Sequence, residues 1–401
     1  PELNLSNDNF IRTSDQKIHW PVAREIWKRL EASGDLYKKT YRGLYCVGHE
    51  AFVTKKDLVN GKCVDHQKEP ELIEEENWFF KLSEYGGDIQ KVIESGDLKI
   101  IPETRKNEVL SFLSGGLEDI SFSRPSKDLS WGVPVPGDES QTMYVWADAL
   151  SNYISGYGGI DKWQEHPADV HVIGKDILRF HAVIWLAMLL SAGLKLPKAI
   201  FVHGHILSDG QKMSKSLGNV IDPFELVKKY GVDATRYFLL RGIPSSEDGD
   251  FSYEKFEERY NGDLANGLGN FAARVLTLGA PLREILSSET DESVEKQLDT
   301  AKKEIKQKIN DFKLNEALAE IWQLIHFGDR YLNERKPWDK SAGKEEKERV
   351  VYNAVVILDN IAALLLPFLP ETAEKITKSI SNQEGKISVK KLENLFPRLE
   401  K

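Results

Sequence analysis

The feature that most constrains the fold is a strand–helix–strand pattern in residues 171–202. A short apolar run ends at Gly174, and a second apolar run covers residues 199–202. Between them, residues 177–190 have the length and the apolar density of a buried helix. Strand, helix and strand with short joints form a βαβ crossover, which belongs to a parallel sheet. We therefore predict half of an α/β fold of the kind that binds nucleotides.

The rest of the chain changes character along its length. Residues 21–36 have helical spacing, and residues 37–70 form a small strand-and-turn module that holds both cysteines. Three short helices are expected at residues 78–82, 89–94 and 109–113, and a strand at residues 143–146. From about residue 260 no strand is expected. Four helical stretches predict a bundle, at residues 263–278, 293–308, 314–332 and 347–366.

Composition limits the class of protein. A chain of 401 residues with 41% hydrophobic content is long enough for two or three domains. No run approaches the ~20 apolar residues of a membrane span, so no membrane is expected. The absence of a leader and the two cysteines favour a reducing cytoplasm. The net charge of -9 excludes binding of nucleic acid as a general polycation, but it allows a local basic groove.

The sharpest motif is the pentapeptide Lys-Met-Ser-Lys-Ser at residues 212–216, which follows a turn at residues 208–210. Its two ammonium groups share one short polar loop. Such a loop can place two cations on a polyphosphate and stabilise the charge that develops as pyrophosphate leaves. The alternative is a solvated surface loop, which is the usual reading of an isolated pair of lysines.

The surroundings of this loop resemble those in the methionyl-tRNA synthetases, a family of class I aminoacyl-tRNA synthetases. The resemblance rests on the lysine loop with its flanking residues 217–219 and 222–223, and on Tyr-Val-Trp-Ala-Asp-Ala-Leu at residues 144–150. Gly-Lys-Asp-Ile-Leu-Arg-Phe-His at residues 174–181 and Gly-Val-Asp-Ala-Thr-Arg-Tyr at residues 231–237 extend it over essentially the whole chain.

The resemblance implies a fold class of α/β plus all-α. It implies an incomplete Rossmann-type catalytic domain with an inserted zinc-knuckle connective domain, followed by a helical anticodon-binding bundle. The expected parts are a remnant of the first half of the catalytic domain (residues 1–37), the connective insertion (38–125), the second half of the catalytic domain (126–200), a signature-loop and stem-contact region (201–258) and the anticodon-binding domain (259–401). The implied activity is ATP-dependent activation of L-methionine to methionyl-adenylate and transfer of methionine to tRNA(Met).

The resemblance also assigns site residues. Lys212 and Lys215 are expected to be catalytic, and ATP, with Mg²⁺, is expected to bind Gly204, Lys212, Met213, Ser214 and Lys215. The methionine site is expected to consist of Trp146, Ala149, Leu150, Tyr153, Asp176, Ile177 and His181. Aromatic faces suit a flexible, polarisable thioether. Read alone, Trp146 and Tyr153 are equally compatible with core aromatics, and a lone His181 on an apolar helix face is more often a core residue.

Two ligand pairs have the spacing of a tetrahedral zinc site. Cys46 and His49 form one pair, and Cys63 and His66 form the other. The family commonly presents cysteines here, so this is a mixed version with the same number of donors. Four protein ligands leave no open position, which makes the role structural. The alternative is a metal-free turn with buried thiols.

In the bundle, Asn270 and Arg274 are four residues apart and share a helix face. The family reads anticodon bases with these two positions and with the tryptophan found here at Trp338. A solvent-facing Asn and Arg would ordinarily carry no meaning. The alternative for Trp338 is that it caps the core of the bundle after Pro337.

The family's His-Ile-Gly-His loop does not occur in these 401 residues. We expect a truncated product, one subunit of a split enzyme, or a degenerate homologue, and we favour a carboxyl-terminal fragment of an active enzyme. Its partners then include tRNA(Met), L-methionine, ATP and the missing segment or a second chain. By itself the chain is expected to form methionyl-adenylate poorly.

Two other functions compete with this reading. A sister class I synthetase for an aliphatic amino acid requires a large editing insertion, for which the chain has no room. A tRNA-binding protein without catalysis is the rival from another class. Methionine-dependent pyrophosphate exchange distinguishes the enzyme from this binding protein.

Overall fold

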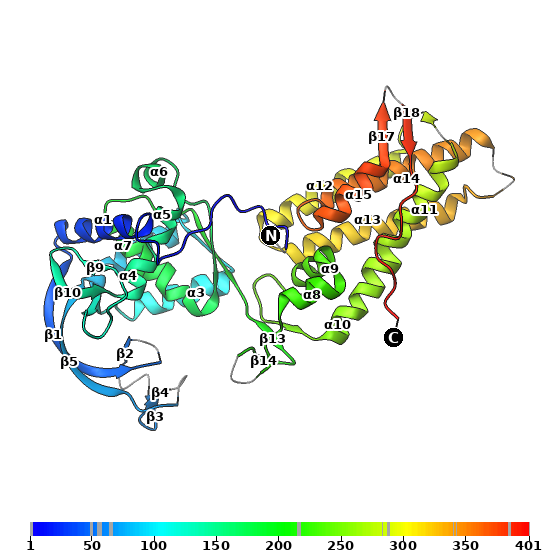
Figure 1. Cartoon of the computed structure of the whole chain (residues 1–401). Coiled ribbons are helices and arrows are strands. Elements are labelled where there is room, and N and C mark those ends of the chain that lie inside the picture. Colours follow the sequence, from blue (N-terminus) through cyan, green and yellow to red (C-terminus); the bar gives the residue numbers. More distant parts are fainter. Residues whose placement is uncertain are drawn as a thin grey trace. The chain divides into compact units, whose positions relative to one another are not determined.

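The computed structural model shows two compact units, which are described separately (Figure 1). The N-terminal unit comprises Asn7–Val202, and the C-terminal unit comprises His203–Lys401 together with Pro1–Ser6. The residues that the structure describes are 3–48, 51–53, 58–63, 67–214, 218–282, 284–286, 289–339, 341, 343–383 and 386–400.

The N-terminal unit begins with a helix and continues as strands and short helices. Its elements are α1 (His19–Ala32), β1 (Leu36–Cys46), β2 (Ala51–Val53), β3 (Leu58–Val59), β4 (Lys62–Cys63), β5 (Glu71–Phe80), η2 (Leu82–Tyr85), α2 (Gly86–Ser95), β6 (Lys99–Ile101), α3 (Glu103–Ser114), β7 (Ile120–Ser121), β8 (Ser123–Pro125), β9 (Pro134–Val135), β10 (Asp138–Met143), α4 (Val145–Ala149), α5 (Asn152–Tyr157), α6 (Ile160–Glu165), β11 (His171–Gly174), η3 (Lys175–Ile177), η4 (Phe180–Trp185), α7 (Leu186–Ser191) and β12 (Ala199–His203).

The predicted strand–helix–strand pattern is confirmed. Strand β12 lies between β11 and β6 and pairs with β6 in parallel. The connection from β11 to β12 is helical, with a 3₁₀ turn, a π-helical segment and α7 in succession. Residues 182–189 of this connection are all buried. An element buried on all sides reads as a continuous apolar run, which is why the sequence pattern identified it.

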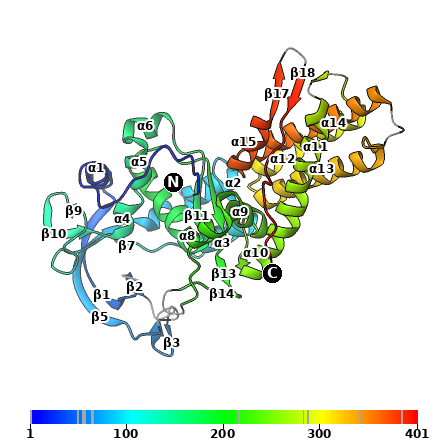
Figure 2. The same cartoon turned by 45° about the vertical axis from the view of Figure 1, so that its right-hand side comes forward.

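A long antiparallel ribbon dominates the inserted region. Strands β1 and β5 pair from Leu36 opposite Phe80 to Tyr45 opposite Glu71 (Figure 2). The predicted helix at residues 78–82 is therefore wrong, because β5 continues to Phe80. Aromatic side chains favour a pleated surface, and Phe80 stacks on Phe122 with ring centroids 5.0 Å apart.

The strand predicted at residues 143–146 is also wrong, except at Met143. Strand β10 ends at Met143, and α4 begins at Val145. The last three side chains of β10, residues 141–143, are all buried, so burial does not alternate before the helix. Trp146 consequently lies on a helix, next to the helix α5 that carries Tyr153.

The C-terminal unit consists of a small mixed sheet followed by long helices. Its elements are β13 (Ile206–Ser208), β14 (Gln211–Lys212), α8 (Pro223–Tyr230), α9 (Val232–Tyr237), η5 (Phe238–Gly242), β15 (Gly249–Phe251), α10 (Tyr253–Arg259), η6 (Tyr260–Gly269), α11 (Asn270–Gly279), η7 (Ala280–Leu282), β16 (Ile285–Leu286), α12 (Glu292–Asn310), α13 (Leu314–Arg335), α14 (Lys344–Leu365), α15 (Pro370–Ser379), β17 (Ile380–Gln383) and β18 (Lys386–Val389).

The predicted bundle is present, but the expectation of no strands after residue 260 is wrong. Strands β16, β18 and β17 form a three-stranded antiparallel sheet. These strands are two to four residues long, so they are too short for a period-2 pattern to stand out from the neighbouring helices.

The close packing of α11 on α13 depends on one glycine. A Cβ atom at Gly328 would lie 2.4 Å from Cζ of Phe271. Phe271 is fully buried in the core of the C-terminal unit. The two helices can approach this closely only because position 328 has no side chain.

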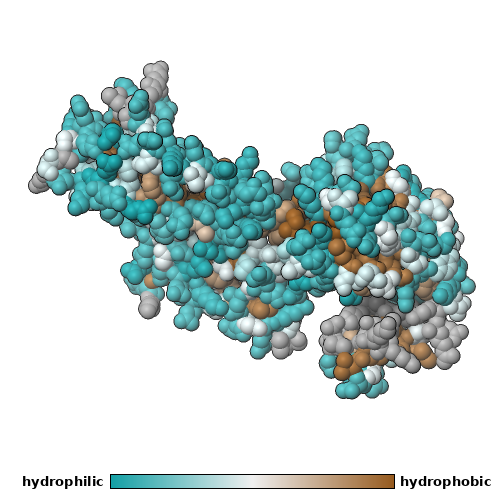
Figure 3. Space-filling model, turned by 180° about the vertical axis from the view of Figure 1, so that it is seen from behind, coloured by the Kyte–Doolittle hydropathy of each residue, from teal (hydrophilic) through white to brown (hydrophobic). Residues whose placement is uncertain are grey.

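Hydrophobic residues gather on one face of the N-terminal unit, whereas the C-terminal unit shows a mostly hydrophilic surface in the same view (Figure 3). Val172 on β11 is 63% exposed. Among the described helices, none combines the length and the hydropathy that a bilayer crossing needs.

Candidate functional site

Three of the residues predicted for the methionine site form one aromatic cluster in the N-terminal unit. The Trp146 ring stacks on Phe180 with centroids 3.9 Å apart, and it meets the His181 ring edge-on at 6.1 Å. The Tyr153 hydroxyl lies 2.7 Å from Nε2 of His181. The fold therefore brings Trp146, Tyr153 and His181 together from α4, α5 and η4.

The other predicted methionine residues have different surroundings. The Ile177 carbonyl lies 2.9 Å from Nδ1 of His181 and fixes that ring. Leu150 is 1% exposed and belongs to the core of the unit, whereas Asp176 is exposed. Ala149 is half-buried at the end of α4. Trp146 and Tyr153 pack against this core.

Two cavities lie next to the aromatic cluster. One of about 660 Å³ includes Asp176 and Phe180 in its lining. The other, of about 640 Å³, includes Tyr153 and His171. Each of these cavities has the size of a small-molecule site.

Sequence reasoning missed two members of the cluster, His171 and Trp185. The Trp185 indole Nε1 donates a hydrogen bond of 3.1 Å to Nε2 of His171. The Tyr153 ring lies 4.1 Å from the His171 ring and 6.1 Å from the Trp185 ring. Trp185 is four residues after His181, and this spacing was the one available signal.

The protonation of the cluster follows from its burial. Burial, followed by the neighbouring His181, lowers the pKa of His171 to about 3. Burial also lowers the pKa of His181 and raises that of Tyr153 to about 12. All three side chains are therefore neutral at physiological pH.

The lysine motif begins in a β-hairpin of the C-terminal unit. Strands β13 and β14 pair with Ser208 opposite Gln211. Between them, Asp209 and Gly210 have positive φ angles of 51° and 74°, which a two-residue type I′ turn requires. Lys212 lies at the end of β14 and is exposed.

Side chains that follow the motif in sequence accept hydrogen bonds from backbone N–H groups. Asn219 accepts a hydrogen bond of 2.9 Å from the Ser214 N–H through Oδ1. Asp222 caps α8 by accepting the Phe224 N–H at 2.8 Å. Met213 packs against the core of the unit. Lys215 lies outside the described residues.

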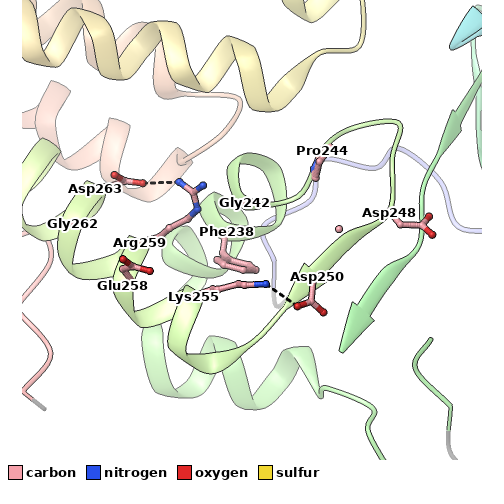
Figure 4. Close-up of a pocket in the computed structure, with 11 residues that line it drawn as sticks. Phe238, Gly242, Pro244, Asp248, Asp250, Lys255, Glu258, Arg259, Gly262 and Asp263 are labelled. Carbon is pink, nitrogen blue, oxygen red and sulfur yellow. Dashed lines mark hydrogen bonds and ion pairs between the residues drawn. The ribbon is translucent and has the colours of Figure 1, made fainter. Parts of the chain in front are cut away.

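A cavity of about 610 Å³ lies next to this hairpin (Figure 4). Asp250, in its lining, accepts the Gly210 N–H at 2.7 Å and pairs with Lys255 at 2.8 Å. The hydrogen bond from Lys255, followed by that from Gly210, lowers the pKa of Asp250. The turn that leads to Lys212 is therefore held by a charged acceptor.

Gly204, predicted to bind ATP, sits where two backbone segments meet. A Cβ atom there would lie 2.1 Å from the carbonyl oxygen of Glu247. The next residue, His205, donates its N–H to Asp248 at 2.9 Å. The approach of the Glu247 carbonyl oxygen to position 204 by itself requires glycine there.

The cysteine module is a β-hairpin with a cluster of its own. Strands β3 and β4 turn at Asn60 and Gly61, both with positive φ. Cys46 and Cys63 are 2% and 1% exposed and share a small apolar cluster with Val53. Within the described residues no group of three or more metal-binding side chains occurs. His49 and His66 lie outside them.

The fold brings two of the three predicted anticodon residues together. The Arg274 guanidinium lies 4.6 Å above the Trp338 ring. Trp338 is 47% exposed and is therefore not a core residue. Arg274 also donates to Asn333 at 2.6 Å and to Asp329 at 3.4 Å. Asn270 is exposed one turn earlier on α11.

Comparison with known proteins identifies the family. Residues 1–65 and 53–276 match the family described as tRNA synthetases class I (M), and residues 291–400 match the anticodon-binding domain of tRNA ligase. The chain belongs to the class I methionyl-tRNA synthetase family. The predicted catalytic domain of class I and the predicted helical anticodon-binding domain are thus both confirmed.

Individual relatives agree with this family. The chain is 44% identical over 397 residues to the methionine–tRNA ligase of Clostridium perfringens, covering 95% of this chain and 61% of that protein. It is 42% identical over 389 residues to that of Brucella suis, covering 93% and 75%. The chain therefore spans less than two thirds of the length of the Clostridium protein.

A solved structure has the same fold. The methionyl-tRNA synthetase of Mycobacterium tuberculosis bound by methionyl-adenylate superposes with a TM-score of 0.90 at 36% sequence identity. The match covers 99% of this chain and 84% of the Mycobacterium chain. The fold of this synthetase family is therefore present across almost all of the chain.

The carboxyl group of Asp148, between Trp146 and Ala149 on α4, provides a pH test of the packing around the cluster. Asp148 is 7% exposed, and burial raises its pKa from 3.8 to about 7. The folded pKa lies above the unfolded pKa, so the native state holds the extra proton between pH ~4 and ~7. This contribution to stability is fully present below pH ~4 and is lost as the pH rises through ~7.

Asp148→Asn should remove this pH dependence. Between pH 4 and 8, we expect the free energy of unfolding of the parent to fall by about 2–4 kcal/mol relative to the variant. Denaturant unfolding followed by circular dichroism at several pH values measures the difference. A constant difference between the two proteins at every pH would contradict the burial of an ionisable Asp148.

Proposed function

We propose that this chain carries the amino-acid site, the lysine signature loop and the anticodon-reading bundle of a methionine–tRNA ligase. The observation that carries the proposal is the aromatic cluster of Trp146, Tyr153 and His181, found in a chain of the methionyl-tRNA synthetase family. The relative from Mycobacterium tuberculosis was solved with methionyl-adenylate bound, which supports the same intermediate here.

The aromatic cluster suits a thioether side chain. The Trp146 and Phe180 rings are stacked, and the polar atoms of Tyr153 and His181 bond to each other. A methionine side chain is flexible and polarisable, and it forms favourable contacts with ring faces and edges. It also needs no strong donor from the protein, so the cluster can bind it without leaving a buried polar group unpaired.

The signature loop suits the departure of pyrophosphate. Lys212 is exposed at the end of a hairpin whose turn is held by Asp250. An ammonium group there can contact ATP phosphates, with Mg²⁺ as their counterion, and Lys215 can supply a second ammonium group. Cations fixed before the reaction stabilise negative charge as it moves to the leaving group. Met213, Ser214 and Gly204 complete the proposed ATP site.

Methionine-dependent exchange of pyrophosphate into ATP tests the activation step. We expect Lys212→Ala to lower the exchange rate by about 100-fold or more, because its contact strengthens in the transition state. The Michaelis constant for methionine should change by less than about twofold. Lys215→Ala should behave in the same way. The assay is run with the 401-residue chain alone and with the family's His-Ile-Gly-His segment added.

Lys378→Ala provides the control for this assay, because Lys378 is an exposed lysine of α15 that pairs with Glu374. This variant should exchange at the parent rate. Exchange that does not depend on methionine would exclude the proposed substrate. If exchange is absent in both arms while tRNA(Met) still binds, the chain is a tRNA-binding protein without catalysis.

We propose that Asn270, Arg274 and Trp338 read the anticodon of tRNA(Met). The Arg274 guanidinium covers part of the Trp338 ring, and the ring remains 47% exposed. Unstacked anticodon bases present a face for an aromatic ring and open edges for hydrogen bonds. The Arg274 N–H groups that Asn333 and Asp329 do not use, together with the Asn270 amide, are available for those edges.

Trp338→Ala should weaken binding of tRNA(Met) by about 1–3 kcal/mol, the contribution of one stacked base. The loss should be confined to the cognate anticodon, and the melting temperature should stay within about 2 °C because the residue is half-exposed. Trp131→Ala is a matched control, since Trp131 is 66% exposed in the N-terminal unit. A variant that melts early but still discriminates anticodons would show that Trp338 serves the fold.

We also propose a structural zinc ion held by Cys46, His49, Cys63 and His66. The buried state of both thiols in one small cluster supports this, because cysteine sulfur is a preferred zinc donor. Cys63 ends the β3–β4 hairpin, and the Gln67 N–H donates to the Cys63 carbonyl at 2.8 Å. The ion would stabilise the knuckle without taking part in the reaction.

Mass spectrometry under native conditions should find one zinc ion per chain. Cys63→Ser should lower the zinc content, because a hydroxyl replaces a thiolate ligand. Removal of zinc with a chelator should expose the Cys46 thiol to alkylation while the helical circular dichroism signal is retained. A metal-free protein whose thiols stay protected would support the alternative of a buried, metal-free turn.

A further inference from the structure

The imidazole of His171 joins the aromatic cluster through Tyr153, His181 and Trp185. It is 2% exposed and accepts the hydrogen bond of the fully buried Trp185. The rings of Tyr153 and Trp163 lie 4.1 Å and 6.0 Å from it, and the His181 ring lies at 6.3 Å. His171 is the first residue of β11, so the sheet fixes its backbone.

The hydrogen bonds determine which nitrogen of each histidine carries the proton. An indole N–H can only donate, so Nε2 of His171 must accept and the proton resides on Nδ1. The Ile177 carbonyl can only accept, so Nδ1 of His181 donates to it. Because the ring is neutral, Nε2 of His181 then accepts the Tyr153 hydroxyl at 2.7 Å.

Tyr153, His181 and Trp185 form an aromatic wall among the described residues. The hydrogen bonds above use every N–H and O–H group of these three side chains. The indole N–H is bonded to His171, and the hydroxyl hydrogen is bonded to His181. What remains for a substrate is ring surface and the lone pairs of the Tyr153 oxygen. A wall of this kind accepts an apolar side chain by its shape and offers no donor to a polar one.

We propose that His171 is a positioning residue that sets the shape of the methionine site without touching the substrate. By accepting the Trp185 N–H and supporting the Tyr153 ring, it holds both side chains in one arrangement. Rings held in this way limit the length of side chain that fits beside Trp146. The inference rests on the proposed function, because it assigns the selectivity of the same amino-acid site.

Replacement of His171 with phenylalanine tests this role, because the variant keeps an aromatic ring but has no acceptor for Trp185. Calorimetry measures the binding of L-methionine and of ethionine, which is one methylene longer. In the parent we expect at least tenfold preference for methionine, the usual cost of one misfitting methylene. In His171→Phe we expect methionine to bind about tenfold more weakly and the preference to fall below about threefold.

His171→Gln should recover most of the affinity and selectivity, since its amide oxygen extends toward the position of Nε2 and can accept the indole N–H. The control is His19→Phe, which removes another buried imidazole of the same unit, one bonded to Ser155 at 2.9 Å. It should lower the melting temperature but leave the preference for methionine unchanged. A purely structural role for His171 would give all three variants the same preference.

Nuclear magnetic resonance reports the hydrogen bond directly. In the parent, the indole proton assigned through Trp185→Phe should exchange slowly, and the His171 nitrogens should show the neutral Nδ1–H form. The inference is overturned if His171→Phe loses this bond yet keeps the parent's affinity and selectivity. It is also overturned if the parent shows no such bond. A parent that shows the bond but binds no methionine overturns the proposed function and this role with it.

Discussion

Residues 181–189 of the helical connection between β11 and β12 have almost no contact with water, and much of the N-terminal unit depends on this burial. From Ala182 to Leu189, every side chain is at most 9% exposed. A polar atom in such an element loses its hydration and must find a partner inside the protein. His181 and Trp185 are the polar side chains there, and both are bonded. The positions of Tyr153 and His171 follow from that requirement.

The lysine motif differs from this buried element. Its neighbours fix the backbone of the motif, and the ammonium group of Lys212 remains exposed to solvent. The Asp209-Gly210 turn, the Asp250 acceptor and the Asn219 clamp all act on main-chain groups. None of these contacts uses the Lys212 ammonium group. The residues that flank the motif in sequence therefore have a structural role that is separate from the chemistry of the lysine.

Sequence was sufficient where one local pattern decides the structure. The buried crossover and the bundle helices were predictable because their apolar runs are long. Trp78 and its neighbours were assigned to the wrong element, since three consecutive aromatic residues fit a strand or a buried helix until the pairing partner in β1 is known. Strand β17 was missed because Ile380–Gln383 is short and mostly polar.

The candidate site was predictable to a similar extent. Trp146, Tyr153 and His181 were named through resemblance, and the fold brings them into contact. The bond between His171 and Trp185 was not predictable, because it joins a strand to a helix 14 residues later. The helix also contains a π-helical segment, which shifts the register on which a face argument relies. Arg274 over Trp338 likewise depends on how two helices pack.

The absence of a side chain at Gly328 affects a hydrogen bond in which this glycine takes no part. Phe271 on α11 fills the space beside this glycine on α13. One turn further along α11 lies Arg274, whose guanidinium reaches Asn333 on α13. The spacing of the two helix axes at the glycine therefore determines whether that arginine can bridge to its partner. A single methyl group at position 328 would act as a wedge, and the surface proposed to read the anticodon would lose its alignment although none of its own residues had changed.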